Sequence, residues 1–248
     1  MTACFEKPER SCYNLVHYAR LVPESHVIFI TPPGCSRIIR LSAIEEGVSD
    51  KFTIFNLEET DLIAGSVEDI FVEGVQQTID RLTDDNRRPK VLLSFTSCVD
   101  GFIGTDHGYV MSRLRAYAPD IIFMDLAMDP INRETLAPLV RVHRTITALF
   151  EKSEPARSVV WLGKWVPPEA DDALAAKLAE RGFENRHLLD CETLDELRAL
   201  GGAAANVAVT KIMLPVVREL KARLGTPYFN LADPADPESL SEEELLNL

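Results

Sequence analysis

Short apolar runs of strand length alternate with amphipathic windows of helix length along most of this chain. The window 66–82 carries apolar side chains at helical spacing behind a plausible Ser66 N-cap. Strands that alternate with helices form a parallel sheet whose central strands are covered on both faces, so the pattern predicts an α/β fold. Each strand run is followed by polar, Gly or Pro residues, and in the first half the runs are 26–30, 52–55, 91–95 and 121–124.

The same alternation recurs after a polar stretch at residues 151–157. It predicts further elements, namely a strand at 158–162, a helix from about 169 to 181, a strand near 187–189, an apolar run at 203–209 and a helix ending at Gly225. We therefore predict two Rossmann-like domains, each a mostly parallel sheet flanked by helices. The first spans 1–153, the second and smaller one spans 154–232, and 233–248 forms an acidic C-terminal tail or short helix.

The charge balance argues against several classes of partner. The chain has 26 Lys and Arg against 39 Asp and Glu, a net charge of −13, which repels nucleic acid and anionic membrane surfaces. No stretch reaches the roughly 18 apolar residues of a membrane span, and nothing near Met1 resembles a secretory signal. We expect a cytoplasmic protein whose five cysteines are core residues, metal ligands or reactive groups rather than disulfides.

Two cysteines directly follow predicted strands. Cys35 comes after the strand 26–30, and Cys98 comes after the strand 91–95. Ligands of parallel α/β sheets bind at the carboxyl ends of strands, where helix N-termini favour thiolates and anions. Cys12 precedes a predicted helix at 13–21 that would return the chain to the same end of the sheet. A free cysteine is often core filling, so position alone does not establish a site.

The spacing of the cysteines disfavours zinc, because the sequence has no C-x-x-C pair and no H-E-x-x-H motif. Iron–sulfur clusters accept thiolates from separate loops more readily. Asp100 and Asp106 are candidate ligand and support residues, although an Asp at a helix start is more often a cap. His107 is a candidate proton donor or a helix-surface histidine, and Cys191 is expected to fill a core.

Three loops together resemble the cluster-binding region of the nitrogenase superfamily catalytic component. The similar features are Cys12 before the first strand, the turn Pro33-Gly34-Cys35 after it, and the stretch from Cys98 to Asp106 after the third strand. Residues 59–65 and 206–228 also resemble family segments, so the likeness covers nearly the whole chain. The family includes the molybdenum-iron protein subunits and dark-operative protochlorophyllide reductase. The sequence resembles a short form of this nitrogenase component 1-like family that lacks the third domain.

The resemblance implies that Cys12, Cys35 and Cys98 bind an iron–sulfur cluster, expected to be [4Fe-4S], with Gly34 and Asp100 beside it. The fourth ligand is Asp100, a group from a second subunit or a non-protein ligand, and a symmetric dimer could instead pool six thiolates around one larger cluster. Val209 stands near the position where the family's molybdenum cofactor is anchored by a cysteine, so dinitrogen is not the expected substrate.

The implied function is a nitrogenase-like reductase subunit. It would receive electrons from an ATP-hydrolysing iron protein, since this chain has no G-x-x-x-x-G-K-[ST] loop, and would pass them to a small molecule. It would act as a homodimer or as a heterodimer with a related subunit. Two alternatives remain open: a non-catalytic scaffold for an iron–sulfur cluster or metallocofactor, and an α/β binding protein without a cluster.

Overall fold

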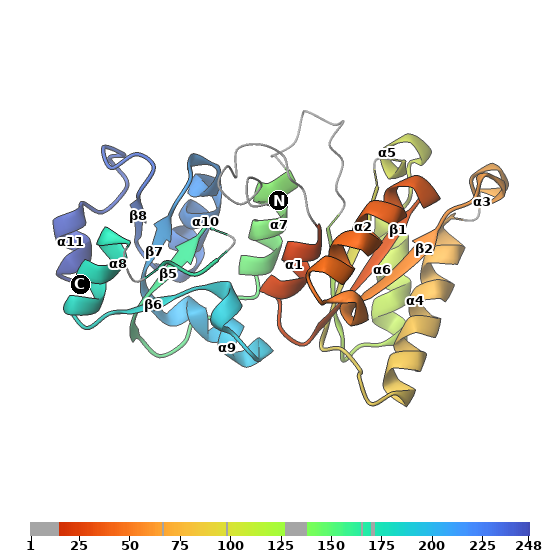
Figure 1. Ribbon diagram of the computed structural model, residues 1–248, viewed down its shortest axis with the longest axis horizontal. Helices are drawn as coiled ribbons and strands as arrows, with labels where there is room; N and C mark the ends of the chain where they lie inside the picture. Colours follow the sequence, from red (N-terminus) through yellow and green to blue (C-terminus); the bar gives the residue numbers. More distant parts are fainter. Residues whose placement is uncertain (1–14, 66, 98, 127–137, 165, 170–171) are drawn as a thin grey trace. The chain divides into compact units, whose positions relative to one another are not determined.

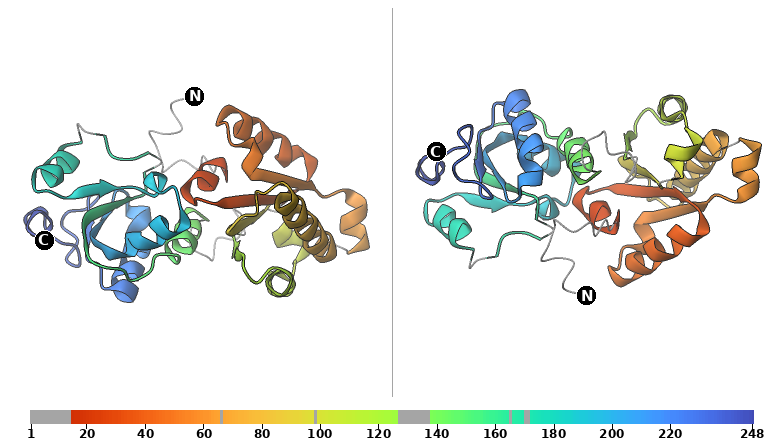
Figure 2. Two further views of the ribbon diagram at one scale, coloured as in Figure 1. Left: turned by 90° about the horizontal axis from the view of Figure 1, so that it is seen from below. Right: turned by 90° about the horizontal axis from the view of Figure 1, so that it is seen from above.

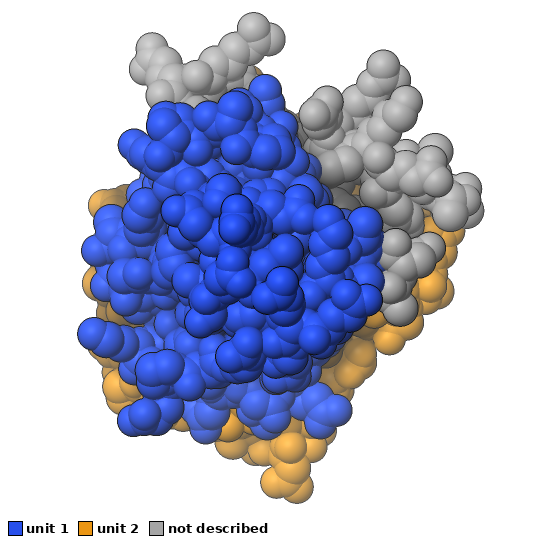
Figure 3. Space-filling view, turned by 90° about the vertical axis from the view of Figure 1, so that its left-hand side faces the viewer, with its two compact units in different colours: residues 1–13, 21–23, 139–248 blue, residues 14–20, 24–138 orange. Residues whose placement is uncertain are grey.

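The computed structural model describes residues 15–65, 67–97, 99–126, 138–164, 166–169 and 172–248 (Figure 1). The chain divides into two compact units, which are coloured separately in Figure 3. Unit 2 comprises 14–20 and 24–138, and unit 1 comprises 1–13, 21–23 and 139–248. The chain passes from unit 2 to unit 1 between residues 138 and 139, whereas the domain boundary at 153/154 stays a prediction from composition.

Unit 2 is built on a four-stranded sheet in the order β2-β1-β3-β4, with every neighbouring pair parallel. Its strands are β1 (Ser25–Thr31), β2 (Phe52–Asn56), β3 (Val91–Thr96) and β4 (Ile122–Asp125), which confirms the four strands predicted for the first half. The α-helices are α1 (Leu15–Leu21), α2 (Pro33–Glu45), α3 (Glu59–Ala64), α4 (Val67–Asp84), α5 (Asp100–Ile103) and α6 (His107–Tyr117), and a short 3-10 turn, η2 (Ser49–Lys51), precedes β2.

Helices cover both faces of this sheet. Helices α4 and α6 pack together on one face, where Phe71 and Leu114 meet Ile28 and Leu92 of the central strands. The connection from β1 to β2 crosses the sheet in the opposite direction to the connections from β2 to β3 and from β3 to β4. Because such crossovers are right-handed, α2 lies on the other face of the sheet (Figure 2). Helix α1 also covers β3, since the rings of Tyr18 and Phe95 stack with centroids 6.3 Å apart.

The strand order creates a switch point between β1 and β3. The chain leaves β1 toward β2 on one side, and β3 and β4 are added on the other side. Ile30 is opposite Thr96, and the amide of Ser97 donates to the carbonyl of Ile30 at 3.2 Å. Ligands of open α/β sheets bind at such points, outside the carboxyl ends of the strands. The segments that follow β1 and β3 are therefore the first place to look for a site.

Unit 1 repeats the topology with the sheet order β6-β5-β7-β8, again parallel throughout. Fully buried Trp161 and Val207 lie at the centre of its core, with Leu178 and Phe183 beside them. Its strands are β5 (Ala156–Leu162), β6 (Glu184–Arg186), β7 (Ala203–Ala208) and β8 (Tyr228–Asn230). Its α-helices are α7 (Pro138–Thr147), α8 (Ala173–Glu180), α9 (Leu194–Ala199), α10 (Leu214–Leu224) and α11 (Glu242–Leu246), and its 3-10 turns are η3 (Leu188–Asp190), η4 (Leu200–Gly202) and η5 (Lys211–Met213).

The strand predicted near 187–189 forms three residues earlier, as β6. The strand ends at Arg186, and residues 188–190 form the 3-10 turn η3. The cause is local hydrogen bonding: the amide of His187 donates to the Asp190 carboxylate at 2.6 Å, and the amide of Leu189 donates to Nδ1 of His187 at 3.1 Å. Polar side chains that bond nearby backbone groups compete with a sheet ladder, and here they divert the chain into a turn.

Candidate functional site

Cys35 lies in the first turn of α2, just beyond the carboxyl end of β1. Pro33 occupies the first turn of this helix, where its fixed φ suits a helix start and its missing N–H costs nothing. The Cys35 side chain is exposed and forms no disulfide. A Cβ added at Gly34 would meet nothing within 4 Å, so open space adjoins this turn. The predicted helix start after the first strand is thus confirmed, and it carries an exposed thiol.

Cys12 and Cys98 lie outside the described residues, so their convergence with Cys35 stays a prediction. The residues on both sides of Cys98 are described, however. Ser97 directly follows β3 and bonds to the backbone of β1, and the amide of Asp100 donates to the Ser97 carbonyl at 3.1 Å. Because β1 and β3 are neighbours, the segments that carry Cys35 and Cys98 leave the same edge of the sheet.

Asp100, His107 and Asp125 form a carboxylate–imidazole–carboxylate triad at this edge. Nε2 of His107 lies 2.6 Å from Oδ2 of Asp100, and Nδ1 lies 2.9 Å from Oδ2 of Asp125. Asp100 begins α5, His107 begins α6, and Asp125 ends β4, so three different elements supply the triad. Its side chains are only 16%, 21% and 27% exposed, respectively. The expectation that His107 is a helix-surface residue is therefore corrected.

The triad fixes its own charge state. The hydrogen bond to Asp100, together with the close carboxylate of Asp125, raises the pKa of His107 to about 10, so the ring is an imidazolium at neutral pH. Burial alone would raise the pKa of Asp100, but the hydrogen bond to His107 holds that pKa below its ordinary value. The two carboxylates share one cation, and Asp100 is engaged by His107 rather than capping a helix.

Asp106 and Asp61 are caps, as their positions favour. The amide of Tyr109 donates to Oδ1 of Asp106 at 2.9 Å, which makes Asp106 the N-cap of α6. The amide of Glu58 donates to Asp61 at 2.8 Å at the start of α3. Asp125 was missed by sequence reasoning, although one signal pointed to it: it is the first polar residue after a buried apolar run.

Cys191 is core filling, as expected. Its side chain is buried in unit 1 and forms no disulfide. Burial raises the pKa of the Cys191 thiol to about 11, which keeps it protonated and unreactive at neutral pH. Within the part of the chain that the structure describes, no group of three or more His, Cys, Asp and Glu residues is arranged to hold a metal ion.

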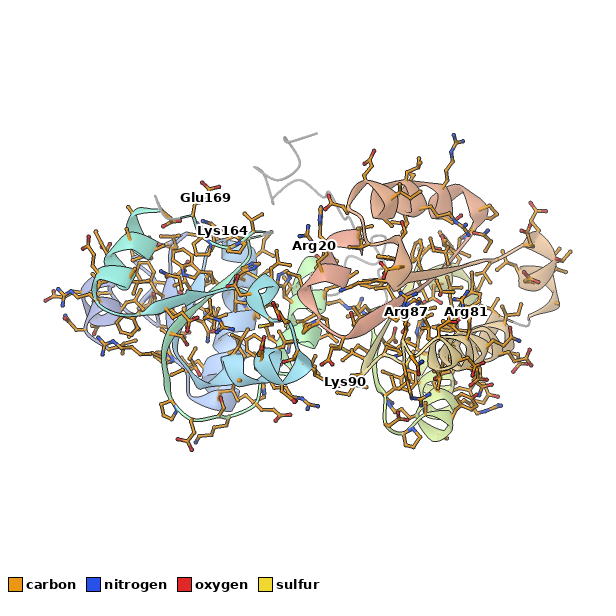
Figure 4. All side chains as sticks on the ribbon, turned by 60° about the horizontal axis from the view of Figure 1, so that its bottom comes forward. Arg20, Arg81, Arg87, Lys90, Lys164 and Glu169 are labelled. Carbon is orange, nitrogen blue, oxygen red and sulfur yellow. The ribbon has the colours of Figure 1, made fainter. Side chains whose placement is uncertain are left out.

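Basic residues gather at the opposite, amino-terminal end of the same sheet. Figure 4 labels Arg81, Arg87 and Lys90 of this group. Burial, followed by the charges of Arg81 and Arg87, lowers the pKa of His26 to about 4, so that ring is neutral. Arg87 is paired with Asp50 at 2.9 Å and Lys90 with Glu24 at 2.8 Å. These pairs account for the charges of Arg87 and Lys90, Arg81 donates to the Thr53 hydroxyl at 3.1 Å, and we assign no site to this end.

Comparisons with known proteins agree with the fold. The family described as Nitrogenase component 1 type Oxidoreductase matches residues 18–242. A solved structure described as "Nitrogenase Cp1 at pH 6.5" has a TM-score of 0.64 at 10% identity, covering 87% of this chain and 52% of that one. A second, "Nitrogenase Cp1 at pH 5", has a TM-score of 0.64 at 16% identity, covering 86% of this chain and 46% of that one.

The chain thus spans about half the length of the two solved structures, and at these identities the likeness establishes the fold alone. No curated protein sequence matches the chain. No helix among the described segments is long and apolar enough to cross a membrane.

Proposed function

Because the chain belongs to the nitrogenase component 1-type oxidoreductase family, we propose that it is a reductase subunit that binds an iron–sulfur cluster. The ligands are Cys12, Cys35 and Cys98. One observation carries the proposal: the Cys35 thiol is exposed at the start of α2, at the same sheet edge from which the segment around Cys98 leaves. A thiol with only a packing role would be buried, as Cys191 is.

The described residues fit such a group. Clusters need thiolates and a pocket that tolerates a bulky anion, and the turn at Gly34 has free space on its outer side. A bound [4Fe-4S] cluster would supply one-electron transfer. Asp100 remains a candidate fourth ligand, but its carboxylate would first have to leave His107, so a second subunit or a non-protein ligand is the simpler source.

The triad of Asp100, His107 and Asp125 holds the segment after Cys98 in place. Asp100 starts α5 two residues after Cys98, and His107 ties it to Asp125 of β4. The triad therefore braces the segment that carries Cys98. His107 holds a proton at neutral pH, and both of its ring nitrogens face carboxylates. Asp106 is the N-cap of α6, and its side chain accepts a hydrogen bond from the Tyr109 amide.

We propose an ATP-hydrolysing iron protein as the electron donor and a small molecule other than dinitrogen as the substrate. The chain has no phosphate-binding loop motif, so nucleotide hydrolysis would occur in the partner. The proposed setting is the cytoplasm, where thiols stay reduced. A homodimer or a heterodimer with a related subunit is the proposed assembly.

A second candidate is a non-catalytic scaffold that holds an iron–sulfur cluster or metallocofactor. The exposed Cys35 thiol among the described residues is compatible with this candidate as much as with the reductase. Such a scaffold would use the same three cysteines but would not reduce a substrate.

Anaerobic reconstitution with iron and sulfide tests the cluster. We expect about four irons per chain with a charge-transfer absorption band, and a strong loss of both in Cys35→Ala. Cys191→Ala is the matched control, because that thiol is buried in unit 1 and should not affect iron content. Less than about one iron per chain in the wild-type protein would reject both cluster proposals.

A second experiment separates the reductase from the scaffold. The reconstituted chain is mixed with an iron protein and ATP, and the visible absorption of the cluster is followed. Bleaching that requires ATP supports the reductase. A fully loaded cluster that stays oxidised with several iron proteins favours the scaffold.

A further inference from the structure

Strand β2 is an outer strand of its sheet, and one of its edges carries backbone groups that no described residue bonds. Its neighbour in the sheet is β1. The amide of Leu57 donates to the Thr31 carbonyl at 3.0 Å, and in a parallel ladder every second residue bonds to the same neighbour. Phe55 therefore bonds to β1, whereas Ile54 turns its N–H and C=O outward. Among the described residues, none bonds to either of these Ile54 groups.

An outer strand of unit 1, β8, shows how the chain covers such an edge elsewhere. The amide of Leu240 donates to the Tyr228 carbonyl at 2.9 Å, and the amide of Asn230 donates to the Ser239 hydroxyl at 2.8 Å. All residues of β8 are buried, whereas every residue of β2 is at least partly exposed. An uncovered strand edge is a template for a further strand, so β2 is able to receive one.

Helix α2 and strand β2 form a groove beside this edge (Figure 1). Phe55 is on the opposite face, where its ring adjoins Gly74 of α4. Side chains alternate along a strand, so Ile54 lies on the α2 face. On the helix, Leu41 is 54% exposed and Ile44 66%, which extends the apolar surface. The groove has a volume of about 260 Å³, and its lining residues are Arg40, Ala43, Ile44, Ser49, Phe52 and Ile54.

Cations predominate around the groove. Arg40 lines it, Arg37 lies one turn earlier on α2, and Lys51 directly precedes Phe52. None of the three cations forms an ion pair within the described ranges, and Glu45 is a single opposing carboxylate at the end of α2. Nearby carboxylates that are already paired are Glu46, with Arg20, and Asp50, with Arg87. In a chain with a net charge of −13, this local excess of positive charge favours an acidic ligand.

We propose that β2 binds an extended, acidic segment of another protein as an added strand. Main-chain hydrogen bonds to Ile54 align the segment along the edge. Apolar side chains at every second position fill the groove against Ile44, and a carboxylate of the segment meets Arg40. In this mode of recognition the main chain supplies affinity and the groove supplies specificity. A helical ligand could not bond to the strand edge, because its own backbone groups are paired internally.

Peptide selection on the full wild-type chain tests the binding, and it needs no cluster. A phage-displayed library of random peptides is selected under reducing conditions, and an enriched peptide is synthesised. We expect apolar residues at alternate positions, at least one Asp or Glu, and micromolar binding by fluorescence anisotropy. Arg40→Glu should weaken binding at least tenfold, and a peptide with Lys in place of the acidic residue should restore it. Arg115→Glu, an exposed charge on α6, is the matched control.

Backbone methylation of the peptide separates an added strand from a contact between side chains alone. Methylating the amides that face β2 should abolish binding, whereas methylating the alternate amides should leave it within about threefold. Ile54→Pro removes the outward N–H and no bond to β1, so the variant should fold and lose binding. If circular dichroism shows that it does not fold, Arg40→Glu and the methylated peptides still decide.

Three results would overturn the proposal. They are the absence of any enriched peptide, binding that Arg40→Glu leaves unchanged, and equal effects of the two sets of methylated peptides. A chain that self-associates in sedimentation equilibrium and becomes monomeric in Ile54→Pro would overturn it as well, since a second copy would then occupy the edge.

Discussion

Removing the charge at His107 should cost stability in a pH-dependent way. The substitution His107→Gln keeps a polar side chain but removes the cation that Asp100 and Asp125 share. At neutral pH it leaves two partly buried carboxylates facing each other without a counter-charge. Removing one partner of a buried ion pair costs more stability than the intact pair contributes, because the remaining charge is left without a counter-charge.

The shifted pKa sets the size of the effect. His107 has a folded-state pKa of about 10 against an ordinary value of 6.5. Each unit of difference corresponds to about 1.4 kcal/mol, so the imidazolium contributes at most about 5 kcal/mol to the free energy of unfolding. Because the folded pKa is the higher one, this contribution is fully present below pH 6.5. It is lost as the pH rises through 10.

The assay is urea unfolding of the cluster-free protein and the His107→Gln variant between pH 6 and 10.5. The stability difference between the two should be largest at pH 6 and should shrink steadily above pH 6.5. Lys177→Gln is the control: its exposed pair with Glu242 is worth less than about 1 kcal/mol, and its effect should hardly vary in this range. A His107 ring that titrates near pH 6.5 by NMR would refute the reasoning.

Three further predictions concern single side chains. Gly201→Ala should destabilise the protein by about 3 kcal/mol in urea unfolding, since its Cβ would lie 2.0 Å from the Glu151 carbonyl oxygen; an unchanged midpoint would contradict this packing. Gly34→Ala has open space, so it should keep or slightly raise stability while lowering iron retention after reconstitution. Asp106→Ala should cost about 1 kcal/mol in thermal melting, because the N-cap bond from the Tyr109 amide is lost; an unchanged melting temperature would contradict this.

Much of the fold can be predicted from local patterns. Strands β1 and β3 are buried along their entire length, so apolar side chains predominate on both faces, as in the run Val27–Ile30 and in Val91–Phe95, where only Ser94 is polar. Prediction placed β6 three residues too late, at 187–189, where Leu188 and Leu189 resemble a strand. There the hydrogen bonds of His187 and Asp190 to nearby amides determine the conformation, and hydrophobicity alone does not register them.

The site was less predictable because its contacts are not local. Cys35 could be placed from the Pro and Gly residues before it, which end the strand and start a helix. The triad could not, since His107 and Asp125 are 18 residues apart and meet only when β4 pairs with β3. In that register Asp125 lies opposite Ser94, and a shift of one residue would turn its side chain to the other face.

On the proposed function, the triad and the cysteine ligands meet different demands. A cluster ligand must stay exposed and reachable, so it contributes little to the core and its segment needs other anchors. The backbone bond from Ser97 to Ile30 secures one side of Cys98, and the ion pair of Asp100 with His107 secures the other. Because His107 also contacts β4, the anchor extends to the rigid sheet rather than to another loop. A half-buried imidazolium between two carboxylates is therefore understandable as the support of a segment that cannot be held by apolar packing.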